Sequence, residues 1–498
     1  MLLTTGLIVG ALWAFYLYLT WNFDYWKKRG VPGPDPIPLV GTFKAFLLRN
    51  RSVMDEKFEI FKKYKSKFNF VGVFMYRSPQ ILITSPALAK DLLTKNFKNF
   101  HDNEFGQVTD KYLDPLFGRN PFVMNGEEWK TKRAEITPAF TTSRMKVMYS
   151  NVEGISNKMS QYIKDREGTP LEGKELAGRF TTDVVSSCIF SADAQSFANE
   201  NAEIREMGRK LMDSSLIFVL KIMLLTVFPT LARIFQVGFI TKPREKFFTK
   251  LMVDAIRHRE SSGEKRADYL DHLLALRQTK NISEIDMAAH GVTFFLDGFE
   301  TSSAAMALAL YELGKKPEIQ QRLREELLAA TGEDGTISYE VLSELPYLEQ
   351  VFSETLRLWP SVTFMSKVCV RPTELDLTPT QKVLIEPGVI AIISLYCIQR
   401  DPDVFEDSFE FNPDRFSAEK GGTNPYQVTG SYMPFGDGPR QCLGMRFGRM
   451  QVKRGIYEIL TKFKVSVNPK TEDPLRIVSS PAVSLGLTGL WLDFKPIA

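Results

Sequence analysis

The ten residues from Phe435 to Gly444 restrict the possible folds of this chain more than any other segment. They read Phe-Gly-Asp-Gly-Pro-Arg-Gln-Cys-Leu-Gly. Gly436 and Gly438 allow a tight turn whose backbone comes close to a ligand, and the proline that follows stiffens it. Cys442 stands just before a predicted helix that begins near Leu443, where the helix dipole and free N–H groups favour a thiolate. The segment predicts a rigid loop that presents one cysteine to a ligand.

This loop resembles the cysteine-ligand loop of the cytochrome P-450 superfamily, F-x-x-G-x-R-x-C-x-G, with all five fixed positions present. The competing interpretation is a buried structural cysteine in a loop. Glycine makes up only about 7 % of residues in ordinary chains and cysteine is rarer, so a chance match to this pattern is a poor competitor. The resemblance extends over essentially the whole chain and is greatest to microsomal members from insects.

The resemblance implies a mainly α fold with small β-sheets, in which residues 39–498 form one catalytic domain. It also implies a heme cofactor whose iron takes the Cys442 thiolate as its axial ligand. Trp129 and Arg133 match the family's W-x-x-x-R helix, whose side chains contact a heme propionate. The full implied cofactor-binding set is Trp129, Arg133, Lys367, Phe435, Gly436, Gly438, Arg440 and Gly444.

Two further segments resemble motifs of the same family and follow one another along the chain in the family's order. Glu354 and Arg357 share one helix face, and Arg415 lies in a segment that resembles the family's second-arginine motif. The resemblance therefore implies a buried charge network of these three residues, which holds the segment before the cysteine loop. An E-x-x-R step alone is a common surface ion pair.

The segment Asp297-Gly298-Phe299-Glu300-Thr301 resembles the family's oxygen-activation motif. Gly298 is expected to open space for dioxygen, Thr301 to guide protonation, and Glu300 to relay protons. Taken alone, this segment is an ordinary helix with a Glu-Thr step. Asp297 departs from the family pattern, because relatives carry Ala or Gly there, and it puts ordinary substrate geometry in doubt.

Two other departures are milder. Lys367 stands where relatives usually have a propionate-binding Arg, and Gln399 replaces a common His. The four cysteines and four histidines are scattered without metal-ligand spacing, so neither a zinc site nor a disulfide framework is predicted. A net charge of +4 without a sustained basic run gives no indication of a nucleic-acid partner.

The N-terminal residues 1–23 carry no charge and are long enough to cross a bilayer as a helix. Trp21, Tyr25 and Trp26 are expected at the membrane interface, and the basic residues 27–29 favour a cytoplasmic orientation. A cleaved signal peptide is the alternative, but there is no basic n-region and no small-x-small cleavage site. These features predict a membrane anchor, a basic and proline-rich tether at 24–38, and a catalytic domain on the cytoplasmic side. The resemblance to microsomal members implies that the membrane is that of the endoplasmic reticulum.

The remaining pattern predicts several elements by their ranges. Short strands are expected at 68–74 and 80–84, and a hairpin at 383–393 around Pro387-Gly388. Residues 216–240 are either a core helix pair or a lip that dips into the membrane. Asn50 and Asn281 stand in glycosylation sequons that remain bare on the cytoplasmic side. Long helices are expected at 282–315, 317–330, 346–359 and from about 443 to 463.

Monooxygenation of a small apolar substrate follows from this site: a foreign compound, a hormone or a lipid. The electrons are expected from an NADPH–cytochrome reductase, with cytochrome b5 as a second donor, because no flavin or dinucleotide motif is present. A heme-thiolate isomerase or dehydratase and a non-catalytic heme protein are the rival functions, and the Glu300-Thr301 pair argues against both. Expected docking cations are Lys130, Lys132, Arg446, Arg449 and Lys453; expected pocket-lining ranges are 122–124, 216–220, 294–299 and 362–364.

Overall fold

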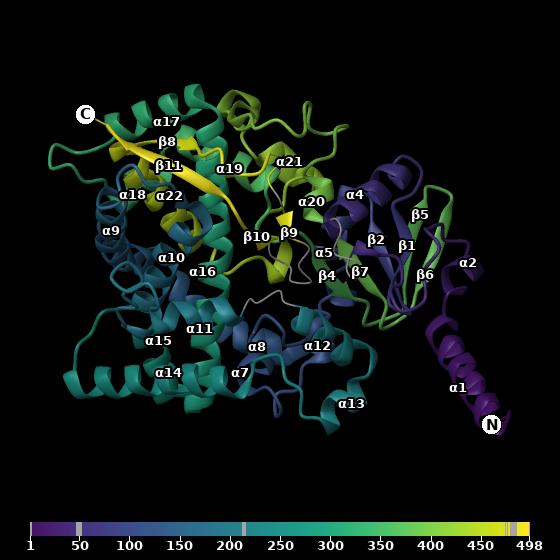
Figure 1. Cartoon of the computed structure of the whole chain (residues 1–498). Coiled ribbons are helices and arrows are strands. Elements are labelled where there is room, and N and C mark those ends of the chain that lie inside the picture. Colours follow the sequence, from purple (N-terminus) through teal and green to yellow (C-terminus); the bar gives the residue numbers. More distant parts are fainter. Residues whose placement is uncertain are drawn as a thin grey trace.

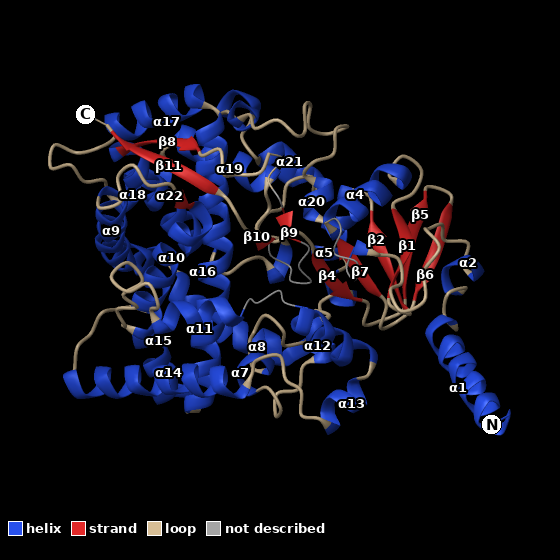
Figure 2. Ribbon diagram, in the orientation of Figure 1, coloured by secondary structure: helices blue, strands red, loops and turns tan. Residues whose placement is uncertain are grey.

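The computed structural model describes residues 2–45, 52–211, 216–473, 475, 477–478 and 486–497. Most of the chain is helical, and the longer helices gather on one side of the molecule, while the main sheet lies on the other side, next to the N-terminal helix (Figures 1 and 2). The expected fold class, mainly α with small β-sheets, is confirmed.

The helices alternate between long packing elements and short connecting turns. In the first half of the chain they are α1 (Leu2–Thr20), α2 (Tyr25–Lys28), α4 (Val53–Tyr64), α5 (Pro86–Leu93), α6 (Phe105–Val108), α7 (Pro115–Gly118), α8 (Gly126–Ile136), α9 (Thr142–Lys164), α10 (Gly173–Phe190), α11 (Glu203–Leu211), α12 (Leu216–Val227), α13 (Pro229–Ile234) and α14 (Lys242–Ser262). In the second half they are α15 (Tyr269–Lys280), α16 (Glu284–Lys315), α17 (Pro317–Ala329), α18 (Tyr339–Glu344), α19 (Pro346–Leu358), α20 (Leu395–Ile398), α21 (Asn424–Thr429) and α22 (Met445–Lys462).

The strands form small sheets. The largest has the order β1-β2-β7-β4, in which β2 and β7 are parallel and the other pairs are antiparallel. A second has the order β3-β11-β8, and two further pairs are β5-β6 and β10-β9. Their bounds are β1 (Phe70–Met75), β2 (Ser78–Ile83), β3 (Leu171–Glu172), β4 (Met365–Val368), β5 (Thr373–Thr378), β6 (Gln381–Ile385), β7 (Ile390–Ile393), β8 (Phe463–Val467), β9 (Ile477–Val478), β10 (Gly486–Leu487) and β11 (Trp491–Pro496).

The long helix α16 runs through the core. Its start is a capping box, in which the Ser283 hydroxyl accepts from the Asp286 backbone N–H at 3.2 Å and the Asp286 carboxylate accepts from Ser283. The helix α10 packs closely along it, because a Cβ at Gly298 would lie 3.1 Å from Val185 of α10. The glycine predicted to open space for dioxygen thus serves this helix contact.

The hairpin predicted at 383–393 is wrong. Gly388 does form a turn with a φ of +92°, but the strands on either side of it enter different sheets. β6 alternates buried and exposed residues and pairs with β5, whereas the last three residues of β7 are buried and it lies between β2 and β4. An apolar strand is more stable inside a sheet than beside a half-exposed partner, and this outweighs the turn signal.

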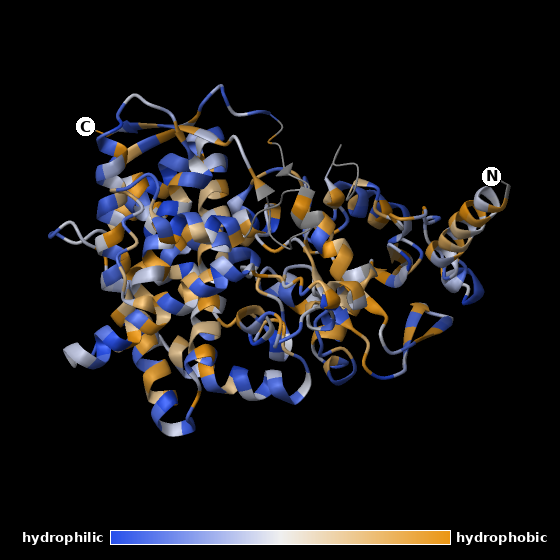
Figure 3. Ribbon diagram, turned by 60° about the horizontal axis from the view of Figure 1, so that its bottom comes forward, coloured by the Kyte–Doolittle hydropathy of each residue, from blue (hydrophilic) through white to orange (hydrophobic). Residues whose placement is uncertain are grey.

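The N-terminal segment begins with α1, whose residues Leu3–Thr20 are long and apolar enough to cross a membrane. In Figure 3 it is the largely orange helix that stands away from the body. The expectation that Trp26 lies at the interface is wrong: its ring packs against Gly72 and its Nε1 donates to the Val73 carbonyl at 3.2 Å. The proline-rich segment is likewise docked, since the Pro32 carbonyl accepts from Gly72 at 2.8 Å.

The apolar stretch 216–240 forms α12 and α13, separated at Phe228. Several of its described side chains point to solvent: Ile217, Leu220, Leu231, Ile234 and Phe235. Ile234 and Phe235 are 67 % and 70 % exposed, which is unlike a pair of core helices. The Phe228 ring stacks on Tyr18 at the end of α1, with 6.4 Å between ring centroids. The exposed patch therefore lies next to the end of the possible membrane helix.

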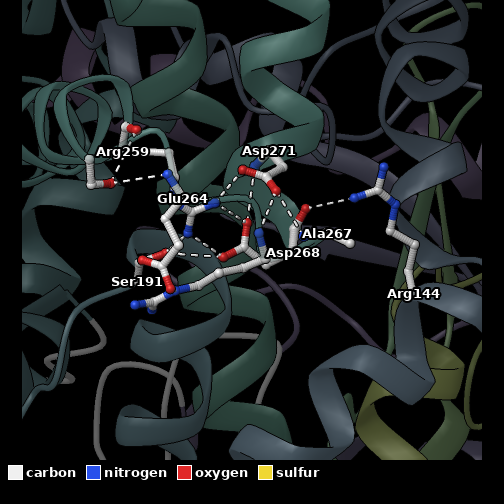
Figure 4. A network of polar contacts seen from close by, with 9 residues as sticks. Arg144, Ser191, Arg259, Glu264, Ala267, Asp268 and Asp271 are labelled. Carbon is white, nitrogen blue, oxygen red and sulfur yellow. Dashed lines mark hydrogen bonds and ion pairs between the residues drawn. The ribbon is translucent and has the colours of Figure 1, made fainter.

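The loop between α14 and α15 is fastened by buried charges (Figure 4). Arg259 Nη2 lies 2.7 Å from the Asp268 carboxylate, and both side chains are almost fully buried. Ser191, which follows α10, donates to the same carboxylate at 3.0 Å. Asp271 contacts Arg259 and accepts two backbone N–H groups, from Arg266 and Ala267, each at 2.8 Å. This network ties α10, α14 and α15 together beside α16.

Candidate functional site

The loop before α22 is closed by its own backbone. Cys442 N donates to the Phe435 carbonyl at 2.8 Å, and Gln441 N donates to the Gly438 carbonyl at 3.0 Å. Gly438 has a φ of +67°, and a Cβ there would lie 2.0 Å from the Leu93 carbonyl oxygen, so only glycine fits. The expected rigid loop that presents Cys442 is therefore observed.

Cys442 borders a space inside the fold. Its side chain is solvent-accessible, whereas the other three cysteines are buried. A Cβ added at Gly444 would meet nothing within 4 Å, and one at Gly448 would meet only the Ser302 hydroxyl at 3.8 Å. Asp297 is also accessible, although the residues around it on α16 are buried. The start of α22 therefore presents a bare surface next to the thiol.

The pKa values of two side chains indicate that this space is shielded from bulk water. Burial and the nearby Asp297 charge raise the pKa of the Cys442 thiol to about 11, against the lowering by a backbone hydrogen bond at Gly444 and by Arg133. Burial raises the pKa of the Asp297 carboxyl to about 7. The lowering of the Cys442 pKa by the backbone at Gly444 has the direction expected at the start of a helix, while burial and the Asp297 charge act in the opposite direction. The Asp297 charge acts on Cys442, so the two groups lie near each other, and both side chains are solvent-accessible.

Three cations surround the loop. Arg440 Nη2 donates to the Met124 carbonyl at 2.7 Å, and its guanidinium carbon lies 4.2 Å from the centroid of the Trp129 ring. Arg133 Nη2 donates to the Gln441 carbonyl at 2.6 Å. Lys367 is buried on β4. Burial lowers the pKa of Arg440 to about 10 and, with the Arg440 charge, that of Lys367 to about 7.

These residues fit a planar anionic cofactor. Within the described residues, none of the three cations forms an ion pair with a carboxylate, although the Asp102 charge acts on Arg440 and Lys367 from further away. Buried unpaired cations are costly, and two anionic groups at this place would relieve the cost. A heme carries two propionates and an iron that takes a sulfur ligand. The unpaired cations, the accessible thiol and the bare glycine surface match these three properties.

A second polar cluster holds the segment before the loop. Arg357 donates to both carboxylate oxygens of Glu354, at 2.7 and 2.8 Å, and both side chains are fully buried. Arg415 donates to Glu354 at 3.3 Å, and Arg357 also donates to the carbonyls of Ser408 and Glu410. The three residues predicted to form a buried charge network are thus brought together.

Gln399 is a connecting residue whose importance the sequence did not indicate. Its side-chain Nε2 donates to the Leu356 carbonyl at 2.8 Å, and its Oε1 accepts from the Met433 backbone N–H at 3.1 Å. It therefore joins the end of α19 to the chain two residues before Phe435. The sequence marked Gln399 only as a mild departure from a common His; the signal was its place just before Arg400-Asp401-Pro402.

The residues of the oxygen-activation motif point in different directions. The Thr301 hydroxyl donates to the Asp297 carbonyl at 2.7 Å, one turn earlier on α16. The Glu300 carboxylate is ion-paired with Lys174 of α10 at 3.0 Å, so it is held toward that helix. Among the described residues, the Asp297 carboxyl has no hydrogen-bond or ion-pair partner. Asp297 is therefore the unpaired polar group at this site.

Some expected pocket-lining residues belong to the core instead. Phe294 packs on Phe140, Tyr269 and Phe447, and Phe295 on Phe190 and Phe248. All aromatic side chains in 294–299 are buried, so Asp297 is the accessible residue of this range. Helical periodicity explains this result, because successive residues point 100° apart and the range cannot line one face. In 216–220, Ile217 and Leu220 are exposed.

The expected docking cations are also divided. Lys130 and Arg446 are exposed, while Lys132 and Arg449 are partly buried and pair with Glu135 and Glu349. The inclusion of Lys453 is wrong: its side chain is 2 % exposed, and it is ion-paired with Glu349 at 2.9 Å. Lys453 lies on the side of α22 that packs into the protein, and its amine donates to the Ser343 carbonyl at 2.9 Å.

Taken together, the α-rich fold and the cysteine loop define a heme-thiolate protein. The family model for Cytochrome P-450 matches residues 31–488. The chain belongs to this family, whose members bind heme with an axial cysteine thiolate and are monooxygenases.

The relatives are insect proteins. The chain is 36 % identical to the probable cytochrome P-450 28a5 of Drosophila melanogaster over 501 residues, which is 99 % of this chain and 98 % of the relative. It is 36 % identical to cytochrome P-450 6a2 of the same species, covering 95 % of both chains. It is 33 % identical to cytochrome P-450 6k1 of Blattella germanica, covering 97 % of this chain and 94 % of the relative.

Proposed function

We propose that this chain is a membrane-anchored monooxygenase that oxidises small apolar molecules carrying a basic or hydrogen-bond-donating group, with Cys442 as the iron ligand. The observation that carries the proposal is the accessible Cys442 thiol in a closed loop, surrounded by cations that form no ion pair among the described residues. A bound heme supplies the oxygen-activating and electron-accepting chemistry, which no side chain of the chain provides.

The cations and Trp129 would hold the cofactor. Arg440, Arg133 and Lys367 would bind the two propionates, and the ring of Trp129 keeps the Arg440 guanidinium in place by stacking. Gly444 and Gly448 would leave the start of α22 flat enough for the macrocycle. Glu354, Arg357, Arg415 and Gln399 position the loop without touching the cofactor.

Asp297 supports the choice of substrate class. Its carboxyl borders the space at Cys442, and burial raises its pKa to about 7, so a cationic or donating group would find an unpaired acceptor there. Thr301 lies one turn further on α16, and its hydroxyl, which donates to the Asp297 carbonyl, would be the group of the motif that holds a proton. Glu300 would exchange protons only after leaving Lys174.

The electrons would come from NADPH through a cytochrome reductase, with cytochrome b5 as a second donor. The exposed cations Lys130, near the middle of α8, and Arg446, at the start of α22, lie on two helices next to the loop and suit an acidic partner surface. The anchor would be residues 1–23, followed by the segment 24–38, with the catalytic domain on the cytoplasmic face of the endoplasmic reticulum. The exposed patch on α13 supports a second contact with the same bilayer.

Substrate-dependent NADPH consumption tests the reaction. Full-length protein loaded with heme and mixed with reductase should consume NADPH faster when a lipophilic amine is added, and one oxygen atom from O2 should appear in the product. Product formation without reductase would instead favour an isomerase or dehydratase. Heme binding without any turnover would favour a carrier.

The Cys442→Ser variant tests the ligand. It should lose the red-shifted absorption of the ferrous carbon monoxide complex, because the sulfur donor is gone. Cys369→Ser is the matched control, since this cysteine is buried and its thiol donates to the Arg371 and Ile385 carbonyls. A Cys442→Ser protein that keeps the red-shifted band would show that the assignment is wrong.

A further inference from the structure

A stripe of cations runs along α14. Lys242, Lys246, Lys250 and Arg257 are all exposed and follow one another at intervals of four, four and seven residues, so they lie on one helix face. The opposite face holds the buried residues Phe248, Met252 and Ile256, which pack into the core. The stripe extends over roughly 22 Å of helix. It borders a shallow groove, whose lining includes Val253 and Ile285.

The charge of this stripe is only partly neutralised. Lys242 pairs with Glu245 at 2.9 Å and Lys250 with Asp254 at 2.5 Å, both within the helix. Lys246 and Arg257 have no ion-pair partner in the part of the chain that the structure describes. Exposed pairs within a helix contribute little, so all four cations remain available to an external anion.

The position of the stripe indicates the kind of anion. α14 begins at Lys242, seven residues after the exposed Phe235 and eight after Ile234. In Figure 1, α14 runs along the lower edge of the molecule, the same edge that carries α13 and toward which α1 points. Arg233, between the exposed apolar residues of α13, is itself largely exposed. Apolar side chains followed by a row of cations are what an interfacial membrane contact requires.

We propose that the α14 stripe binds the anionic headgroups of the bilayer that holds α1, and so sets how the catalytic domain lies on the membrane. This inference rests on the proposed membrane location. The patch on α13 would enter the acyl region, and the stripe would lie at the headgroup level beside it. Each basic residue near an anionic surface changes partitioning by roughly fivefold, so neutralising three of them is expected to weaken this contact by about a hundredfold.

A fluorophore on α14 reports the contact. Ser261→Cys places one reactive thiol on the exposed end of the helix, because Cys188, Cys369 and Cys397 are buried and Cys442 faces the inner space. The labelled full-length holoprotein is inserted into vesicles of phosphatidylcholine alone or with phosphatidylserine, each carrying a headgroup spin label as quencher. Quenching should be stronger with phosphatidylserine, and raised salt should abolish the difference.

Charge-neutral variants separate this contact from the anchor. Lys246→Gln, Lys250→Gln and Arg257→Gln combined should remove the phosphatidylserine effect, while cosedimentation with vesicles persists through α1. The matched control, Lys420→Gln, Lys464→Gln and Lys495→Gln, changes the same charge on exposed residues; Lys464 and Lys495 lie on β8 and β11, at the upper edge in Figure 1, and this variant should leave quenching unchanged.

Two results would overturn the proposal in distinguishable ways. Equal quenching in both vesicle types, with the protein sedimenting with each, would show that the stripe does not bind anionic headgroups. The proposed membrane location would be unaffected by this result. Protein that sediments with neither vesicle type would remove the membrane location and the stripe's role together.

Discussion

At the scale of single residues, the site combines one thiol, one carboxyl and several cations that have few partners of their own. Asp297 is the residue that distinguishes this site chemically, because its carboxyl is unpaired among the described residues and borders the same space as Cys442. Tyr269 of α15 and Cys442 are the titratable groups on which its charge acts. A group that titrates near neutral pH makes ligand binding depend on pH.

Asp297→Asn should remove a pH dependence of amine binding. The wild-type carboxyl has a raised pKa of about 7, so it is protonated below that value and charged above it. A lipophilic amine that stays cationic should therefore bind more tightly as the pH rises from about 6 to about 8.5. The asparagine variant should bind it weakly and equally across this window. Ligand-induced spectral titrations measure the dissociation constant, and a neutral ligand of the same shape is the control. An unchanged pH profile would place Asp297 outside the binding space.

Gln399→Leu should destabilise the protein through three lost hydrogen bonds. It would leave the Leu356 and Arg357 carbonyls and the Met433 N–H without their buried side-chain partner. Each unsatisfied buried group costs about 1–3 kcal/mol, so the melting temperature should fall by several degrees and heme should be lost more readily. Gln278→Leu, on the exposed face of α15, should change neither. Equal melting temperatures for the two variants would contradict this account.

The sequence predicted the Glu354–Arg357–Arg415 network because its motifs are continuous in sequence. It missed Gln399 because one amide connects two segments that only the fold brings together. It placed Lys453 on the surface because the spacing of charges does not reveal which face of α22 is buried. The residue type gives the chemistry of a side chain, whereas the groups that the side chain contacts depend on tertiary packing.

At the scale of elements, the helices were predictable and the strand pairing was not. The predicted range 282–315 agrees with α16 within two residues, since capping and periodicity are local signals. The range 383–393 failed because β6 pairs with β5, the strand just before it, whereas β7 pairs with β2, which is far away in sequence, and with β4. Turn chemistry sets the local bend, but pairing is decided by which faces are buried.

Asp268→Asn should loosen the junction of α10, α14 and α15. The carboxylate neutralises Arg259, whose side chain is almost fully buried, and also accepts from the N–H of Asp271 at the start of α15. Removing one partner of a buried ion pair typically costs about 3–5 kcal/mol, because the remaining charge stays buried. Thermal unfolding of the heme-free and heme-loaded protein measures the loss. Asp254→Asn, whose pair with Lys250 is exposed, should cost less than about 1 kcal/mol. Similar losses for both would show that the junction does not depend on this charge.

At the scale of the whole molecule, the features assigned to a membrane lie on one side. α1, the exposed patch on α13 and the cation stripe on α14 occupy the lower edge in Figure 1, and the main sheet packs against the segment that follows α1. The sequence indicated α1 and left 216–240 open between core and membrane, because apolar composition alone does not reveal exposure. Asn281 is described at the end of α15, whereas Asn50 lies outside the described residues.

Deleting residues 1–23 should weaken membrane attachment without abolishing it. The cut leaves Trp26 and Pro32 docked on the sheet, so the catalytic domain keeps its packing. The patch on α13 would then hold the domain by itself. Adding Ile234→Asp and Phe235→Asp should release it, because burying each apolar side chain is worth roughly tenfold or more in partitioning. Cosedimentation with phosphatidylcholine vesicles measures this. Leu328→Asp and Val428→Asp, on exposed apolar residues of α17 and α21, should leave binding unchanged. A truncated protein that is fully soluble before these substitutions would show that α13 has no contact with lipid.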